Sequence, residues 1–220
     1  MLKELINTIK EKRFARSQVY LLKKEGSLLN AFSNSKTIFI HIPKTAGLSV
    51  VKAIYGDVSG GGHRTISFYK YVLAKDLSDY FTYTFIRNPY DRLYSAYKFL
   101  EKGGMNQCDR QAFEIHLKRY SNFQDFVLNG LNKRMMRDIM HFIPQTDFIC
   151  DKKGRVLVNY IGKFENLQID FKTLSDKLNK EIVLPHLNLN KKESFDKIFT
   201  VEMRKIVRKL YAKDFEILGY

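Results

Sequence analysis

The chain has 220 residues, of which 45% are hydrophobic and 28% are charged, and these proportions exclude a disordered or fibrous protein. Lysine and arginine outnumber aspartate and glutamate by 38 to 23, which gives a formal net charge of +15. This excess favours anionic partners, namely nucleic acid, an acidic membrane surface, an anionic glycan or a phosphorylated nucleotide, and does not choose among them.

The number of cysteines and the lengths of the apolar segments give information on the cellular compartment of the protein. The two cysteines, Cys108 and Cys150, are too few for a disulfide framework or a thiolate metal site, and two free thiols are favoured over one disulfide. The sequence has no run of about 18 apolar residues and no apolar core of a secretion signal at its amino end. We therefore expect a cytoplasmic protein without a transmembrane segment, although a trimmed chain would look the same.

The amino-terminal segment is basic. Residues 2–24 carry apolar residues at helical spacing among many cations, which predicts a helix. Such a helix can lie on a membrane surface, but it more often docks on its own domain. We expect residues 1–30 to form a helical extension and residues 31–220 to form the main domain.

Strands and helices alternate after this extension. Residues 36–42 and 80–86 are rich in β-branched and aromatic residues, as buried parallel strands are. Helices are predicted at 48–55, at 66–79 and from Asn88-Pro89 to about Leu100, since Asn is a good N-cap and Pro a good first helical residue. A capping-box pattern opens a short helix at residues 121–124.

The carboxyl-terminal part continues the alternation. Residues 147–150 and 156–161 flank a turn at Asp151–Gly154, which predicts a hairpin, and helices are expected at 166–179 and 200–215. The pattern predicts a single α/β domain with a central, largely parallel sheet flanked by helices.

The segment His41–Ser49, between the first strand and its helix, has the chemistry of a phosphate cradle. Gly47 lets the backbone approach a ligand, and the N–H groups at the helix start point outward with the positive end of the dipole. Lys44 adds a cation, and Thr45 and Ser49 add hydroxyl donors. The segment is not a Walker A loop, because its lysine precedes its only glycine. Taken alone, it is more often an ordinary strand-to-helix turn.

A second anion-binding pattern follows the second strand. Arg87 stands where that strand ends, at the sheet edge where ligands usually bind. Ser95 lies six residues after Pro89, about 9 Å along the helix. A guanidinium with a nearby hydroxyl suits a phosphate monoester, although Arg87 alone could equally be half of a buried ion pair. Two such cradles suit a ligand with two separated anionic ends.

The segments HIPKTAGLS (41–49) and FIRNPYDRLYSAY (85–97) closely resemble the two donor-binding motifs of the carbohydrate sulfotransferase superfamily, in its bacterial and Golgi branches. The donor is 3′-phosphoadenosine 5′-phosphosulfate (PAPS), and its product is 3′-phosphoadenosine 5′-phosphate (PAP). The resemblance assigns Arg87 and Ser95 to the 3′-phosphate. Leu48 departs from the threonine common in the family, so its backbone N–H would serve instead. The 5′-phosphosulfate role falls to Lys44, Thr45, Ala46, Gly47, Leu48 and Ser49.

Further blocks resemble the family in the family's order, so the likeness covers roughly residues 36–220. It implies a P-loop-like α/β domain and sulfuryl transfer from PAPS to an acceptor hydroxyl, of a glycan first and a protein tyrosine last. No metal is implied, and the sequence has no cluster of carboxylates suited to one. The blocks are Gly62–Thr65, Pro144–Asp147, Gly162–Glu165, Pro185–Asn188 and Tyr211–Tyr220.

Catalytic roles follow from the resemblance. Sulfuryl transfer needs a cation at the leaving oxygen and a base for the acceptor proton. Lys44 is the cation in this interpretation. His63 is the base, since it follows Gly60-Gly-Gly62 and the family places a base in this block; alternatively it only positions the loop, and His186 lines the acceptor site. His41 is expected to pack beside the cradle.

Three other functions remain open at this point. A catalytically silent relative would bind PAPS or PAP as a sensor, which the presence of Lys44, His63 and Arg87 disfavours. A P-loop kinase is disfavoured by the missing Walker A pattern. A nucleic-acid-binding module fits the charge, but the aromatics do not form a basic, aromatic stacking surface along the sequence. The oligomeric state cannot be predicted.

Overall fold

The computed structural model describes residues 2–60, 62–184 and 195–220 and divides the chain into two compact units. The first, here called the sheet unit, comprises Met1–Ile42, Ala46–Phe85 and Asp147–Pro185. The second, the helical unit, comprises Pro43–Thr45, Ile86–Thr146 and His186–Tyr220. The loop predicted to hold an anion therefore contributes residues to both units.

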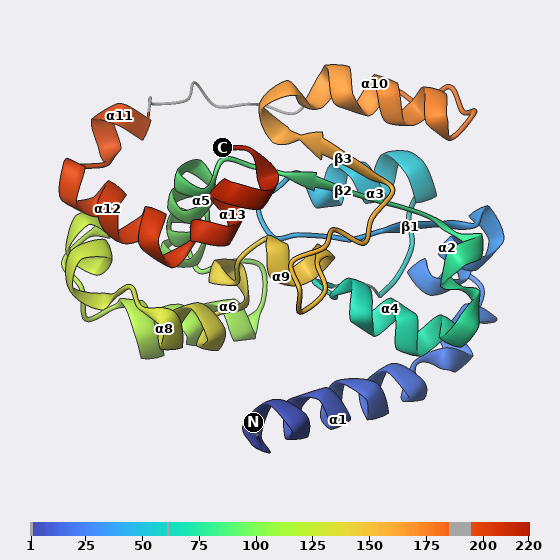
Figure 1. Ribbon diagram of the computed structural model, residues 1–220, viewed down its shortest axis with the longest axis horizontal. Helices are drawn as coiled ribbons and strands as arrows, with labels where there is room; N and C mark the ends of the chain where they lie inside the picture. Colours follow the sequence, from blue (N-terminus) through green and yellow to red (C-terminus); the bar gives the residue numbers. More distant parts are fainter. Residues whose placement is uncertain (1, 61, 185–194) are drawn as a thin grey trace. The chain divides into compact units, whose positions relative to one another are not determined.

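A three-stranded sheet in the order β1-β2-β3 organises the sheet unit (Figure 1). The strands are β1 (Thr37–Phe39), β2 (Phe81–Ile86) and β3 (Tyr160–Lys163). β1 and β2 pair in parallel, with Ile38 opposite Thr82. The hydroxyl of Thr84 is buried and donates to the carbonyl of Ile40 at 2.7 Å, which ties β2 to the chain just after β1. Both predicted strands and the α/β class are confirmed.

Helices flank this sheet. α2 packs against β1 and α10 packs against β3, whereas α1 lies along α4 (Figure 1). The docking of the amino-terminal helix on its own unit is thus confirmed, although the predicted helix over 2–24 stops at Ser17 and resumes as one 3-10 turn. The helical segments are α1 (Leu2–Ser17), η1 (Val19–Leu22), α2 (Leu28–Ser35), α3 (Gly47–Tyr55), α4 (Ile66–Leu73), η2 (Ala74–Asp79), α9 (Thr146–Ile149), η6 (Phe164–Asn166) and α10 (Leu167–Lys177).

The hairpin predicted around residue 152 is wrong in its first arm. Residues 146–149 form α9, and only an isolated antiparallel bridge joins Cys150 to Val156. The turn itself is present, with Gly154 at φ 80°. The helix starts where Asp214 accepts hydrogen bonds from the backbone and the hydroxyl of Thr146, both at 2.9 Å. This contact spans 68 residues of sequence, so no local pattern announces it.

The helical unit is built on α5 (Pro89–Glu101), which begins as predicted. The side chain of Asn88 caps the helix by accepting from the N–H of Tyr90 at 3.0 Å. An aromatic core lies beneath α5, where Tyr97 and Phe142 stack on Phe126. The other segments are α6 (Gln107–Ala112), η3 (Phe113–Leu117), α7 (Phe123–Asp125), η4 (Phe126–Gly130), α8 (Lys133–Asp138), η5 (Met140–Phe142), α11 (Phe195–Ile198), α12 (Val201–Leu210) and α13 (Ala212–Leu218).

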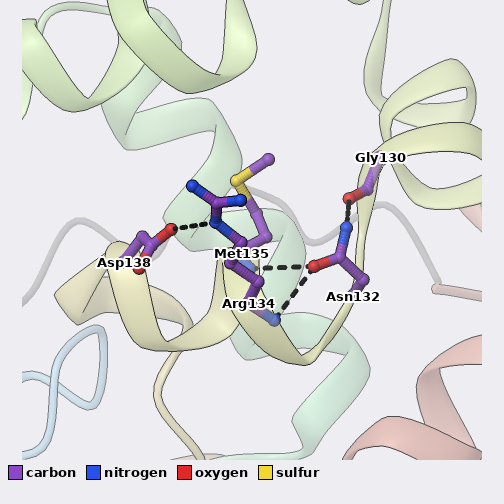
Figure 2. Close-up of polar contacts among 5 residues, drawn as sticks. All are labelled: Gly130, Asn132, Arg134, Met135 and Asp138. Atoms are coloured by element: carbon purple, nitrogen blue, oxygen red, sulfur yellow. Dashed lines mark hydrogen bonds and ion pairs between the residues drawn. The ribbon is translucent and has the colours of Figure 1, made fainter.

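Asparagines cap several short helices of this unit. At residues 121–124 the cap is Asn122, one residue later than predicted, because Ser121 bonds to the carboxylate of Asp125 instead. Figure 2 shows the same device at α8, where Asn132 accepts from the N–H groups of Arg134 and Met135.

Candidate functional site

The cradle loop has an unusual backbone. Lys44 and Ala46 adopt left-handed φ values of 70° and 67°, which side-chain-bearing residues rarely do and which cluster at functional sites. α3 starts immediately after Ala46. A Cβ on Gly47 would lie 1.9 Å from the ring of His41, so glycine is required there by this ring. The sequence predicts that Gly47 lets a ligand approach the backbone. The structure adds a second reason for glycine, which is the space taken by the His41 ring.

The side chain of Lys44 occupies a strongly perturbed environment within the helical unit. Its ammonium lies 3.9 Å from the centre of the Phe99 ring. The pKa of Lys44 is lowered to about 8, first by burial and then by the nearby Arg87, while Asp109 acts in the opposite direction. The guanidinium of Arg87 donates to the carbonyl of Lys44 at 3.3 Å. The structure thus brings together one cation from each predicted cradle.

Arg87 stands on a rigid backbone support that the sequence reasoning missed. The side-chain amide of Gln145 accepts from the N–H of Arg87 at 2.9 Å and donates to its carbonyl at 2.7 Å. Gln145 is fully buried, and its own N–H bonds to Asp214 at 2.9 Å. Two family-like blocks, at 144–147 and 211–220, therefore meet behind Arg87, and the two blocks were the only sequence signal for this support.

A second arginine of the same motif has an internal role. Arg92 is 1% exposed and donates to the carbonyls of His141 and Ile143 at 3.2 and 2.7 Å. Its guanidinium lies 5.8 Å from the ring of Tyr211. Arg92 therefore fixes the turn after α8 and contributes to the fold of this unit. Arg87, which directly follows β2, is by contrast only half-buried.

The other predicted binding residues differ in exposure. Thr45 is fully buried and Ser49 is half-buried. Leu48 is 61% exposed at the first turn of α3. Ser95 lies on α5, the helix predicted for it, and is half-buried. The roles that the resemblance gives to these residues stay predictions.

His63 belongs to the sheet unit and has a defined orientation there. Its Nδ1 lies 3.0 Å from the carbonyl oxygen of His41, and the two rings meet edge to face at 4.3 Å. Because a carbonyl can only accept, this contact places a proton on Nδ1. The lone pair of the neutral ring is then on Nε2, which is the tautomer that a base at Nε2 requires.

The loop carrying His63 is tied at both ends to the amino-terminal segment, an arrangement here called the clasp. Before His63, the N–H of Ser59 bonds to the carbonyl of Gly26 at 2.8 Å. After it, the hydroxyl of Thr65 donates to Glu11 at 2.7 Å. Arg64, next to His63, lies 4.6 Å from the ring of Phe14. Residues 1–30 therefore support this loop.

Four further sequence predictions concern His186, the two cysteines, metal binding and membrane-spanning helices. His186 lies outside the described residues. Cys108 and Cys150 are both free thiols, as predicted. Within the described part of the chain no group of three or more His, Cys, Asp or Glu side chains could hold a metal ion. No helix in those ranges has the length and apolar character needed to cross a bilayer.

Comparison with known proteins gives one match. The model of the Sulfotransferase family matches residues 30–220. No curated protein and no solved structure matches the chain. The family match covers most of the chain and includes the cradle loop, the loop of His63 and the Arg87 motif. Together with the confirmed α/β architecture, it shows that this chain belongs to the sulfotransferase family, whose enzymes transfer sulfuryl groups.

Proposed function

We propose that the chain transfers the sulfuryl group of PAPS to an acceptor hydroxyl of a glycan. The observation that supports this proposal most is the contact between Lys44 and Arg87. Arg87 is close enough to lower the pKa of Lys44, which is about 8, and a bound anion would relieve this repulsion between the two cations. Perturbed groups of this kind are typical of functional sites.

The residues present fit such a donor. Arg87, on its rigid support, offers a forked donor for the 3′-phosphate, and Ser95 on α5 offers a hydroxyl. Lys44 offers a point charge for the phosphosulfate. The first N–H groups of α3 are a further anion-binding element, since a helix of nine residues has a partial positive charge at its start.

In the proposed reaction the acceptor oxygen attacks sulfur, and the bond from sulfur to the bridging oxygen of the nucleotide breaks. His63 takes the acceptor proton at Nε2, while Nδ1 keeps its proton on the carbonyl of His41. Lys44 stabilises the negative charge on the departing phosphate of PAP. We also propose that residues 1–30 form an extension and residues 31–220 the catalytic domain, in accord with the start of the family match.

The nucleotide specificity of the chain tests the donor proposal directly. PAP, with a phosphate at each end, should bind far more tightly than AMP, which lacks the 3′-phosphate that Arg87 and Ser95 are proposed to hold. Isothermal titration calorimetry of the full chain with each nucleotide measures the difference. Equal affinities for PAP and AMP would contradict a site with two anionic ends.

Proton uptake on binding tests the role of Lys44. At pH 8 the free lysine is about half protonated, because its pKa is about 8. A bound phosphate stabilises the charged form and raises this pKa, so PAP binding should take up to about half a proton per chain. Calorimetry in two buffers of different ionisation enthalpy measures the uptake.

The matched variant for this measurement is Lys44→Met, which keeps the length of the side chain and removes the titrating group. It should bind PAP more weakly and lose the uptake. If Lys44→Met takes up as many protons as the natural chain, another group faces the phosphate and the assignment of Lys44 is wrong.

A further inference from the structure

The ammonium group of Lys44 lies on an aromatic ring rather than beside a charged partner. Its nitrogen is 3.9 Å from the centre of the ring of Phe99, which belongs to α5. Within the part of the chain that the structure describes, this ammonium makes no hydrogen bond and no ion pair. Its N–H donors are therefore uncommitted, while the attraction of a cation to the face of the ring holds it in place.

The ring of Phe99 is itself held by the fold. Phe99 is half-buried and packs against the hydrophobic core of the helical unit. On this core its ring lies 5.0 Å from the ring of His141, and the carbonyl of His141 accepts from the buried Arg92 at 3.2 Å. The surface that carries Lys44 is thus supported by buried residues of the same unit.

A buried carboxylate completes the surroundings of Lys44. Asp109, on α6, is only 7% exposed, although carboxylates are rarely buried without a partner. The N–H of Met105 donates to it at 2.9 Å. The backbone of Gly104 passes so close that a Cβ there would lie 2.1 Å from the Cβ of Asp109. The carboxylate is therefore fixed in position, and it favours the charged form of Lys44.

His141 faces both of these groups. Its Nδ1 lies 3.8 Å from a carboxylate oxygen of Asp109, which is too long for a hydrogen bond and suits an ion pair when the imidazole is protonated. The charged groups near Lys44 are thus Arg87, which disfavours its charge, and Asp109, which favours it, with His141 next to Asp109.

We propose that Phe99 and Asp109 are positioning residues for the proposed sulfuryl transfer, in which the ring sets the place of the Lys44 ammonium and the carboxylate keeps it charged. In this arrangement the N–H donors of Lys44 remain available to the bridging oxygen of the donor. A direct ion pair would also hold the ammonium, but it would have to break before the donor binds. The proposal rests on the proposed function for its effect on turnover, whereas the place and the charge of Lys44 can be measured without a nucleotide.

NMR of the full chain with ¹³C-labelled lysine tests the place of the ammonium. A CH₂ group over the face of an aromatic ring is shifted upfield by the ring current, so the Cε protons of Lys44 should lie upfield of those of exposed lysines. Phe99→Leu should remove this shift, and Phe99→Tyr, which keeps the ring, should retain it. The signal is identified by its loss in Lys44→Met. An upfield shift that is absent from the natural chain, or that survives in Phe99→Leu, would overturn the role of Phe99.

Phe113→Leu is the matched control for Phe99→Leu. Phe113 is also a partly buried phenylalanine that packs against the core of the helical unit. Its replacement should leave the Lys44 signal unchanged. Equal changes in Phe113→Leu and Phe99→Leu would mean that a loosened core displaces Lys44, and would refute the assignment to the Phe99 ring.

Titration of the same lysine signals with pH tests the role of Asp109. Asp109→Asn removes the charge and keeps an oxygen that can accept from Met105. The pKa of Lys44 should fall below about 8, because Asp109 is the group that opposes burial and Arg87. Asp138→Asn, which neutralises an exposed carboxylate of the same unit, should leave this titration unchanged. The same Lys44 pKa in Asp109→Asn and in the natural chain would overturn the role of Asp109.

Single-turnover kinetics with PAPS measures the consequence for the reaction. Phe99→Leu should be about 2- to 30-fold slower, the range that a cation–π contact contributes between exposed and desolvated sites, and Phe99→Tyr should be close to normal. Because Lys44 must be charged to act, kcat/KM should fall as the pH rises through its pKa. That fall should begin at a lower pH in Asp109→Asn.

These measurements keep the two proposals apart. If the natural chain turns over PAPS and the variants change neither the Lys44 signals nor the rate, the positioning role is refuted and the donor proposal stands. If Phe99→Leu and Asp109→Asn change the Lys44 signals as expected and the natural chain does not turn over PAPS, the holding of Lys44 is supported and the proposed donor is wrong.

Discussion

Replacement of His63 by alanine should lower the rate of sulfuryl transfer about 10²- to 10⁴-fold, the usual contribution of a positioned general base. PAP affinity should stay almost unchanged, because His63 is proposed to act on the acceptor. The rate of the natural enzyme should also rise with pH as the imidazole loses its proton, since only the neutral ring accepts one. This rising limb should be absent in His63→Ala. Single-turnover kinetics with radiolabelled PAPS measures both effects.

The control for this variant is His63→Gln. A glutamine amide can still donate to the carbonyl of His41, which now receives the Nδ1 proton at 3.0 Å, but it cannot act as a base. If His63→Gln restores the rate, His63 only positions its loop. Near-normal turnover of His63→Ala would place the base elsewhere, and His186 would be the next residue to change.

Replacement of Arg87 by alanine should weaken PAP binding about 10- to 150-fold, since a lost charge-assisted hydrogen bond costs on the order of 1.5–3 kcal/mol. The backbone of residue 87 should stay in place, because Gln145 holds it through its N–H and its carbonyl rather than through the guanidinium. The pKa of Lys44 should rise in the variant, because Arg87 is one of the causes that lower it. Calorimetric titration with PAP measures the loss of affinity.

Arg134 provides the matched control for Arg87. It lies in the same unit on α8, its side chain is 87% exposed, and its ion pair with Asp138 is 3.4 Å long (Figure 2). Such surface pairs contribute little to stability, so Arg134→Ala removes the same charge without disturbing the fold. Similar losses of PAP affinity in Arg87→Ala and Arg134→Ala would favour a diffuse basic surface over a donor site.

The strands and the helices beside the cradles could be predicted from the sequence because their signals are local. The β-branched runs of β1 and β2, the cap at Asn88 and Pro89, and the glycine that ends α3 all act within a few residues. The predictions failed where a distant residue decides the structure. Asp214 takes both donors of Thr146 and turns a predicted strand into α9.

Prediction of the candidate site from the sequence is limited in the same way, by contacts between residues that are far apart in the chain. The two sequence motifs identify Lys44 and Arg87 as candidates, because each residue follows a predicted strand. The contact between them and its effect on the pKa of Lys44 depend on the folded chain. Gln145 and Asp214 could not be assigned as supports of Arg87, because their partners are 58 and 69 residues away in the sequence. The tautomer of His63 likewise depends on a carbonyl 22 residues before it.

The clasp couples the amino-terminal segment to the loop of His63 energetically. Glu11 and Gly26 bond to Thr65 and Ser59, so any opening of the loop must break contacts with a segment that precedes the family match. By thermodynamic reciprocity, whatever orders the loop also orders the segment, and whatever binds the segment changes the loop by the same free energy. Binding of a partner to the segment before residue 30 would therefore change the stability of the loop that carries His63.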